Sequence, residues 1–341
     1  MTNSATVRRE ETATVPLGDS GLRVRPIGLG CMGMSQFYGE ADRAESIATI
    51  RAAIDLGVDF FDTSDMYGAA TPVPGQPSRG FGHNERLLGE AVRSRRDEVV
   101  IGTKFSARPG ESGSTFDGRP EYVRAACDAS LSRLGTDRID VYYYHRLDPG
   151  VPIEETAGAM AELVTAGKVR ALGLSHLPAD LLRRAAAVAP ISVLQSEYSL
   201  WERAIEVEVL PACRRLGITL VPYSPLGRAM LTGTIGRDAT FSDTDFRSTV
   251  PKFQGDNLAH NLRPVEALRA FSEQRGCTPG QVALAWLLAQ PMDVAPIPGT
   301  KRIAYVRENL GATAVPLSAD DVAALNVLFA PSAIRGAQYG S

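Results

Sequence analysis

Short, continuous apolar runs alternate with longer amphipathic segments along most of the chain. Runs such as 99–105 (VVIGTKF) and 169–175 (VRALGLS) are largely apolar at successive positions, which is typical of parallel strands buried on both faces. Between the runs, apolar residues recur at helical spacing, as Ile47, Ile50 and Ile54 do. The predicted strands are 27–30, 59–63, 99–105, 139–145, 169–175, 192–197, 218–223 and 293–298.

Helices are predicted after these strands. They lie at 42–56, 84–94, 121–134, 153–166, 179–189, 205–216 and 302–311, with further helices at 263–275, 279–290 and 319–329. Eight strand–helix units predict an α/β fold, a closed (β/α)8 TIM barrel, here preceded by a β-hairpin at 14–26. The alternative is a doubly wound sheet. The segment GLGCMG (28–33) has the Gly-x-Gly-x-x-Gly spacing of such folds, but a loop follows it instead of a helix.

Capping residues and loop lengths refine this outline. Asp42 with Glu45 predicts a capping box, as does Thr278 with Gln281, and Ser318 predicts the start of the last helix. Two loops on the predicted active-site side, 69–83 and 227–262, are longer than simple connectors. Loops of this length usually cover an active site or lack fixed structure.

Composition narrows the class of protein. The chain has 341 residues, 44% of them hydrophobic, which suits one barrel domain over 14–341 with a flexible tail at 1–13. A net charge of -3 and the absence of a basic run argue against nucleic-acid and membrane-surface partners. There is no apolar run of membrane-spanning length and no signal core at the N-terminus. Four scattered cysteines predict free thiols and a cytoplasmic location.

Polar side chains stand where three neighbouring strands are predicted to end. Asp62 ends the second strand, Lys104 the third and His145 the fourth, and Tyr67 follows on the loop after the second. Barrel enzymes carry their chemistry at these carboxyl ends, so we expect the four side chains to converge. A lysine in an apolar run is costly to bury unless it is paired, and Asp62 is the expected partner.

These residue types suit proton transfer to a carbonyl oxygen. A phenol has a reference pKa of ~10, and a neighbouring ammonium lowers it. A histidine can hold the substrate oxygen in place. The structural alternatives are a buried Asp62–Lys104 ion pair, a core His145 and a packed Tyr67. An aldolase that uses Lys104 as a Schiff base is another alternative.

A family resemblance adds to these observations. It rests on the segments GLGCMGMS (28–35), FFDTSDMYG (60–68), GTKF (102–105), DVYYYHR (140–146), GLSH (173–176), QSEYSLW (195–201), PYSPLGRAMLTG (222–233) and PIPGTKRIAYVRENLGA (296–312). In their order and spacing they resemble the aldo-keto reductases, from residue 14 to beyond Asn309. The resemblance implies NADPH-dependent, reversible reduction of aldehydes or ketones without a Rossmann domain. It also implies a catalytic tetrad of Asp62, Tyr67, Lys104 and His145, with Tyr67 as the proton donor. The competing function is a regulatory or channel-subunit barrel that binds the cofactor with little turnover.

The same resemblance implies a set of cofactor contacts. They are Gly30, Cys31, Met32, Asp62, Ser175, Gln195, Tyr223, Ser224, Leu226, Gly227, Gly299, Thr300, Lys301, Arg302, Tyr305, Glu308 and Asn309. Independently, the stretch 299–302 joins a strand end to a helix N-terminus and carries two cations. That arrangement suits a 2′-phosphate, and so NADP over NAD, although a solvated basic turn is the alternative.

The sequence departs from the family pattern at two places. His176 follows Ser175 where relatives often have Asn or Glu, and the stretch 69–83 is longer than usual. The substrate itself is left open. The expected pocket walls are Met32, Met34, Phe37, Tyr38, Trp201 and Arg228.

Overall fold

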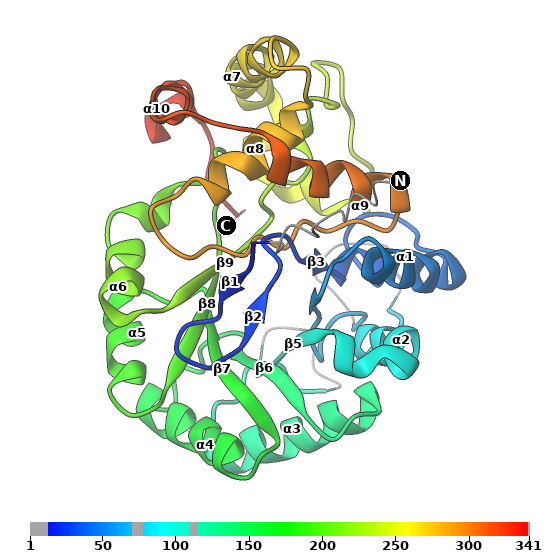
Figure 1. Cartoon of the computed structure of the whole chain (residues 1–341), viewed down its shortest axis with the longest axis vertical. Helices are drawn as coiled ribbons and strands as arrows, with labels where there is room; N and C mark the ends of the chain where they lie inside the picture. Colours follow the sequence, from blue (N-terminus) through cyan, green and yellow to red (C-terminus); the bar gives the residue numbers. More distant parts are fainter. Residues whose placement is uncertain (1–12, 70–77, 110–114, 340–341) are drawn as a thin grey trace, which may run out of the picture.

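The computed structural model describes residues 13–69, 78–109 and 115–339. The predicted tail at 1–13 therefore lies almost wholly outside the described residues, as does most of the long loop at 69–83. The described residues form a parallel barrel surrounded by helices (Figure 1). The predicted (β/α)8 barrel is confirmed, and the doubly wound sheet is wrong.

Seven parallel strands form one sheet in chain order. They are β3 (Leu29–Gly30), β4 (Phe60–Asp62), β5 (Val100–Phe105), β6 (Ile139–Tyr144), β7 (Val169–Ser175), β8 (Ile191–Glu197) and β9 (Thr219–Tyr223). The stretch 293–299 takes the eighth position, because Val294 pairs with Leu220 of β9 and Gly299 pairs with Gly30 of β3.

This eighth segment is only partly bonded to β3. The carbonyl groups of Pro296 and Pro298 accept hydrogen bonds from the amides of Gly28 and Gly30. Proline has no amide hydrogen, so neither residue can donate a ladder bond in return. The predicted strand at 293–298 therefore closes the barrel without forming a regular strand.

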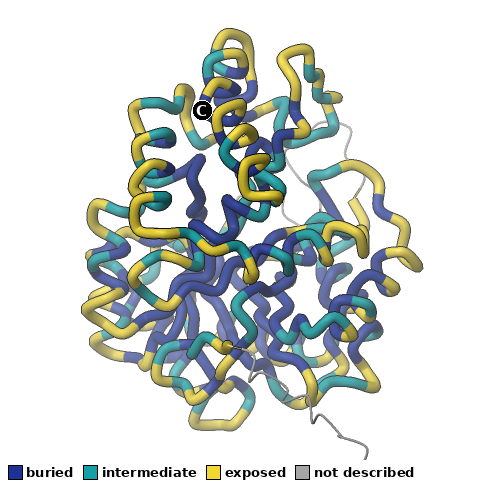
Figure 2. The backbone as a smooth tube through the Cα atoms, turned by 45° about the horizontal axis from the view of Figure 1, so that its top comes forward, coloured by how far each residue is buried: buried dark blue, intermediate teal, exposed yellow. Residues whose placement is uncertain are grey.

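Ten helices cover the barrel or extend from it in the described part of the chain. They are α1 (Arg43–Asp55), α2 (His83–Val92), α3 (Pro120–Leu134), α4 (Ile153–Thr165), α5 (Ala179–Ala186), α6 (Val209–Leu216), α7 (Gly255–Glu273), α8 (Pro279–Leu288), α9 (Ile303–Leu310) and α10 (Ala319–Leu328). Helices α1 to α6 each contact the next around the barrel, and α9 contacts α1 and α8. Figure 2 shows the buried strands enclosed by helices whose outer faces are exposed.

Two helices begin several residues away from their predicted starts, and each contains a proline. Helix α7 begins at Gly255 and not at 263, and Pro264 lies inside it. Its apolar face, which includes Leu258 and Leu262, is buried on both sides of that proline, so packing outweighs the local cost. Helix α6 begins at Val209 and not at 205, with Pro211 in its first turn, the one part of a helix that tolerates proline.

The predicted helix caps are mostly present. Thr278 and Gln281 form a capping box at α8, and Ser318 caps α10. Asp42 accepts a hydrogen bond from the amide of Glu45 at 2.7 Å. For Glu45, no bond from its side chain back to Asp42 is present, so only half of the predicted box forms.

The N-terminal hairpin closes one end of the barrel. Its strands are β1 (Val15–Pro16) and β2 (Arg23–Val24), and Leu17 packs into the barrel interior. Thr219, at the start of β9, donates to the carbonyl of Pro16. The hairpin thus covers the amino ends of the strands, and the carboxyl ends remain for a functional site.

Candidate active site

Alternate residues of each strand face the barrel interior. The interior cluster contains Phe60, Val100, Val141, Tyr143, Ala171, Val193 and Val221. Continuing the same alternation to the carboxyl ends gives Asp62, Lys104, His145, Ser175, Gln195 and Tyr223. The predicted site residues on β4 to β9 therefore share one inward phase and meet at one end of the barrel.

Lys104 joins the acid and the phenol. Its Nζ donates to Asp62 Oδ1 at 2.6 Å, to the carbonyl of Thr63 at 2.8 Å and to Tyr67 Oη at 3.2 Å. Lys104 is completely buried, and these three bonds use all its donors. The predicted pairing of Asp62 with Lys104 is present.

An aromatic ring lies beneath the hydrogen-bonded array of Asp62, Lys104 and Tyr67. The Lys104 Nζ lies 5.7 Å from the ring centroid of Tyr143, which fills the barrel interior. A Cβ at residue 173 would approach that ring to 2.3 Å, so only Gly173 leaves room for it. The ring shields the ion pair from below.

Burial dominates the titration of the array. It raises the pKa of Asp62, and Lys104 offsets the rise only in part. It also raises the pKa of Tyr67 above its ordinary value, against the lowering effect of Lys104. We expected the ammonium to lower this phenol pKa, and the net direction is opposite. Burial disfavours the Lys104 ammonium as well, but Asp62 and Tyr67 outweigh it and raise the lysine pKa.

His145 is a neutral ring at the edge of the array. Burial, followed by Arg146 and Lys104, holds its pKa well below the ordinary range. Its ring lies 5.9 Å from that of Tyr67, edge to face, and its Nδ1 lies 3.2 Å from Ser64 Oγ. The ring can therefore offer its other nitrogen to a substrate oxygen.

The predicted cofactor contacts Gly30, Cys31 and Met32 follow one another at the end of β3. Gly30 ends β3 and pairs with Gly299, and a Cβ on Gly30 would lie 2.9 Å from the carbonyl of Ile297. Cys31 donates its amide to the carbonyl of Asp62, and burial raises the pKa of its thiol. Met32 begins a short 3-10 helix. The lack of a side chain at Gly30 therefore lets β3 lie against the segment 293–299 that closes the barrel.

Two of the predicted cofactor contacts lie on β7 and β8. Ser175 and Gln195 are paired in register and nearly buried. Gln195 donates its Nε2 to Asp62 Oδ2 at 2.8 Å, which leaves the side-chain oxygen of Gln195 as the group that can accept from a ligand. His176 has a positive φ of 53° and contacts Tyr339 edge to face.

The loop after β9 forms a tight turn. Tyr223 ends the strand, and its Oη lies 2.7 Å from Tyr339 Oη. Ser224 and Gly227 have positive φ angles of 48° and 57°, and the Gly227 amide donates to the Ser224 carbonyl. Leu226 packs against a buried apolar cluster that includes Trp201 and Leu231.

The residues predicted for the phosphate end lie between the eighth segment and α9. Lys301 donates its Nζ to the carbonyl groups of Tyr38, at 2.9 Å, and of Glu40. Burial, with help from Arg302, lowers the pKa of Lys301. Arg302 is exposed, and its guanidinium lies 6.0 Å from the ring centroid of Tyr305. Thr300 accepts from the Arg302 amide.

Two further predicted cofactor contacts, Glu308 and Asn309, are bonded or buried within the protein. Glu308 accepts a hydrogen bond from Thr278 Oγ1 at 2.9 Å, and so it ties α9 to α8. Asn309 is buried with 8% exposure.

Sequence reasoning did not assign a second ion pair at the same end of the barrel. Glu197 ends β8 and binds Arg228 through two bonds, at 2.7 and 2.8 Å. Gln338, near the C-terminus, donates to Glu197 at 2.7 Å, and Tyr339 packs on the Arg228 guanidinium. The inward phase of β8 was the signal that could have found Glu197, two residues beyond Gln195.

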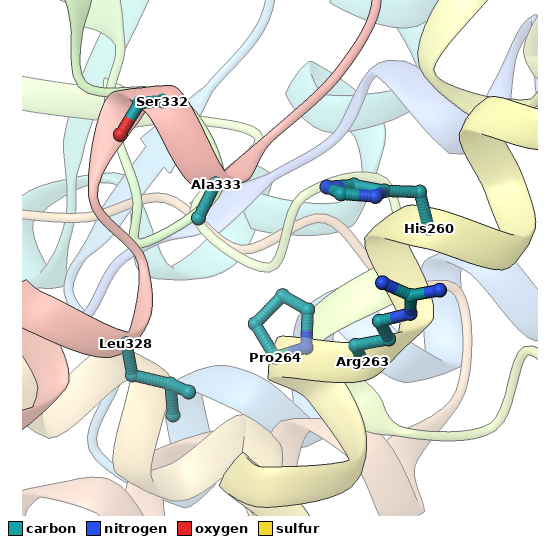
Figure 3. Close-up of a pocket in the computed structure, with 6 residues that line it drawn as sticks. All are labelled: His260, Arg263, Pro264, Leu328, Ser332 and Ala333. Carbon is teal, nitrogen blue, oxygen red and sulfur yellow. The ribbon is translucent and has the colours of Figure 1, made fainter.

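A cavity of about 350 Å³ lies elsewhere, between α7 and the chain that follows α10 (Figure 3). Its lining residues are His260, Arg263, Pro264, Leu328, Ser332 and Ala333. It contains none of the predicted site residues. Within the described ranges, no group of three or more His, Cys, Asp or Glu side chains is placed to hold a metal ion. Among the same residues, no helix has both the length and the apolar character to cross a membrane.

Comparisons with known proteins agree with this architecture. The model of the Aldo/keto reductase family matches residues 26–329. The structure is similar to that of the glycerol dehydrogenase AKR11B4 from Gluconobacter oxydans, with a TM-score of 0.84, 28% identity and coverage of 94% of this chain and 96% of the other. It is also similar to the thermostable aldo-keto reductase Tm1743, determined with the inhibitor epalrestat, with a TM-score of 0.73, 29% identity and coverage of 93% and 99%.

The chain belongs to the aldo-keto reductase family, as its motifs predicted. It is therefore a member of a family of carbonyl oxidoreductases that generally use nicotinamide cofactors.

Proposed function

We propose that this protein is an NADPH-dependent aldo-keto reductase that reduces aldehydes or ketones to alcohols. The observation that carries the proposal is the bonded array Asp62–Lys104–Tyr67, with His145 beside it, at the open end of the barrel. When bound, the nicotinamide supplies hydride to the carbonyl carbon. Tyr67 donates the proton to the carbonyl oxygen, and Lys104 stabilises the phenolate that remains.

The other members of the array support this proton transfer. Asp62 holds the Lys104 ammonium, and Gln195 holds the second oxygen of Asp62. His145, kept neutral by burial, orients the substrate oxygen without repelling Lys104. Because these side chains are buried, their charges and hydrogen bonds act more strongly on a bound substrate than they would in water.

The cofactor contacts fit a dinucleotide phosphate. Gly30 and Gly299 pair with each other where the barrel closes, and their backbone presents no side chain to a ligand. Arg302 is exposed at the N-terminus of α9, and Lys301 lies beside it, so the two cations suit a 2′-phosphate. We further propose a reducing, cytoplasmic location, which the four unpaired cysteines support, and a single barrel domain over 14–341.

The first test is binding, followed by turnover. Protein fluorescence is titrated with NADPH and NADH in parallel, and tighter quenching by NADPH is expected. A panel of aldehydes and ketones is then followed at the NADPH absorbance, with glycerol added in the oxidative direction because one structural relative is a glycerol dehydrogenase. Failure of the folded protein to bind either cofactor contradicts the proposal. Binding without turnover on any substrate favours the regulatory alternative.

Variants at the phosphate end test the cofactor preference separately. Arg302→Ala should weaken NADPH binding by about 10- to 100-fold, the cost of one charge-assisted hydrogen bond, and leave NADH binding unchanged. Arg307, which is exposed on the same helix, provides the matched control as Arg307→Ala. An equal loss for both cofactors would remove the 2′-phosphate argument and leave the reductase proposal intact.

A further inference from the structure

Ser64 lies between the catalytic-site histidine and a second buried acid. Its Oγ is 3.2 Å from His145 Nδ1 and 3.2 Å from Asp65 Oδ1. The amide of Met66 also points at this oxygen, at 3.4 Å. A hydroxyl has one proton to donate and two acceptor positions, so Ser64 can donate to His145 or to Asp65 but not to both.

Two complete arrangements follow from this count. If Asp65 is protonated, it donates to Ser64, Ser64 donates to His145 Nδ1, and the ring proton is on Nε2. If Asp65 is ionised, Ser64 donates to Asp65, and His145 donates from Nδ1 to Ser64, so Nε2 has no proton. In both arrangements every proton between Asp65, Ser64 and His145 Nδ1 has an acceptor.

The surroundings of Asp65 favour the proton. Asp65 is 1% exposed, and its Oδ2 has no hydrogen-bond partner among the described residues. Its neighbour Glu85 is held instead by Arg133, at 2.5 Å, and by Thr103, at 2.6 Å. Arg133 is therefore bonded to Glu85 and not to Asp65, which lies beside that pair.

Among the described residues, the charged and titratable groups around Asp65 include Glu85 on α2, Arg133 and Tyr122 on α3, and Tyr142 on β6. Lys104 accepts from the Asp65 amide through its carbonyl, and His145 is linked to Asp65 through Ser64. Burial first, and Glu85 second, raise the pKa of Asp65 well above its usual range, and Arg133 offsets them in part. The protonated form therefore persists to higher pH than in an exposed aspartate, and it is lost as the pH rises further.

We propose that Ser64 and Asp65 are positioning residues that set the tautomer of His145. Protonated Asp65 holds the Nε2–H tautomer, which donates to a substrate carbonyl oxygen and favours reduction. Ionised Asp65 holds the Nδ1–H tautomer, whose Nε2 accepts from an alcohol and favours oxidation. The kinetic part of this inference rests on the proposed reductase function.

The change between the arrangements is balanced. Asp65 passes its proton to Ser64, Ser64 passes its own proton to Nδ1, and Nε2 releases one proton to the open end of the barrel. No charge remains on Ser64 or on the ring. The net change is the ionisation of Asp65, with the proton leaving from the histidine.

Histidine nuclear magnetic resonance tests the tautomer without turnover. The protein is labelled with ¹⁵N-histidine, and long-range ¹H–¹⁵N correlations identify which ring nitrogen is protonated as the pH is raised. Only four histidines are present, so His145→Gln assigns the signal. The wild type should change from the Nε2–H to the Nδ1–H tautomer. A tautomer that is the same at every pH overturns the proposal.

Two variants identify the residues responsible. Asp65→Asn, which does not titrate, should give one His145 tautomer throughout, and Ser64→Ala should uncouple the tautomer from pH. Ser106→Ala is the matched control, because Ser106 is a buried hydroxyl that accepts from the Arg146 amide and does not touch the His145 ring. A wild-type pH response in folded Asp65→Asn or Ser64→Ala would overturn the assignment.

Kinetics supply the second readout. Carbonyl reduction should fall as the pH rises, with the same midpoint as the tautomer change, and this limb should be missing in Asp65→Asn. Ser64→Ala should lower kcat about three- to tenfold, the effect of one hydrogen bond, with little change in cofactor binding. A tautomer change in a protein that reduces no carbonyl would support the relay and contradict only the proposed function.

Discussion

Two buried ion pairs lie at the same end of the barrel, and they are built differently. Lys104 meets one oxygen of Asp62 and shares its ammonium with Tyr67 and a backbone carbonyl. Arg228 meets both oxygens of Glu197. The ammonium of Lys104 distributes its three donors over three different acceptors, one of which is the Tyr67 phenol, whereas the planar guanidinium of Arg228 directs two parallel donors at a single carboxylate.

This difference suits the first pair to proton transfer and the second pair to holding the structure together. The Asp62–Lys104 pair is bonded to the Tyr67 phenol, so its charge can act on the phenol proton. The Glu197–Arg228 pair holds the loop after β9, and Glu197 also holds the C-terminal segment through Gln338. We therefore expect the first pair to govern turnover and the second to govern stability and the shape of the mouth.

The largest expected effect comes from the phenol at the end of the first pair. Tyr67→Phe should lower carbonyl reduction by about 10²- to 10⁴-fold, the range typical of a lost general acid. NADPH binding, measured by fluorescence, should stay close to the wild-type value because no predicted cofactor contact is removed. A mutant with normal turnover would contradict the role of Tyr67 and weaken the distinction between the pairs.

Breaking the second pair should act on folding. Arg228→Met leaves Glu197 buried and unpaired, and it should lower the free energy of unfolding by about 3–5 kcal/mol. The double variant Arg228→Met with Glu197→Gln should recover part of that loss. Denaturant unfolding measures both.

An exposed ion pair is the control for that experiment. Arg124 and Glu162 are 47% and 60% exposed, and Arg124→Met should leave the stability nearly unchanged. An equally small loss for Arg228→Met would mean that Glu197 is solvated or neutral, and the contrast between the two pairs would fail.

The smallest effect is expected at the phenol that touches the second pair. Tyr339→Phe removes the contact between Tyr339 Oη and Tyr223 Oη, and it should lower the free energy of unfolding by no more than about 1 kcal/mol, since water can replace the bond. The same denaturation experiment checks it. A loss as large as that of Arg228→Met would show that the phenol pair, and not the ion pair, holds the C-terminal segment.

The sequence predicted the barrel and its order because each element is coded locally. Apolar runs and helical periodicity placed β4 to β9 and α1 to α5 to within a few residues. The alternation of side chains along each strand also places Asp62, Lys104 and His145 at the same end of the barrel, and this follows from the local sequence alone. Errors appeared where local signals conflict, as at Pro264, which lies inside a helix that its buried face maintains.

The strand positions led to the predicted site residues, but they did not reveal the pKa shifts of those residues. Proximity to Lys104 predicts a lower pKa for Tyr67, and the burial that reverses this direction belongs to the whole barrel. Likewise, Glu308 was expected to face a ligand, and its bond to Thr278 follows from how α8 and α9 pack.

Local chemistry thus settles which residues stand at the strand ends, since side-chain alternation and helix periodicity are properties of neighbouring residues. Which of those residues share protons depends on contacts between segments far apart in the chain. Ser64 meets His145, Glu197 meets Arg228 and Gln338, and Gln195 meets Asp62 only after the barrel has closed. Burial and pairing of charges are set by that closure, so they were decided by the tertiary structure alone.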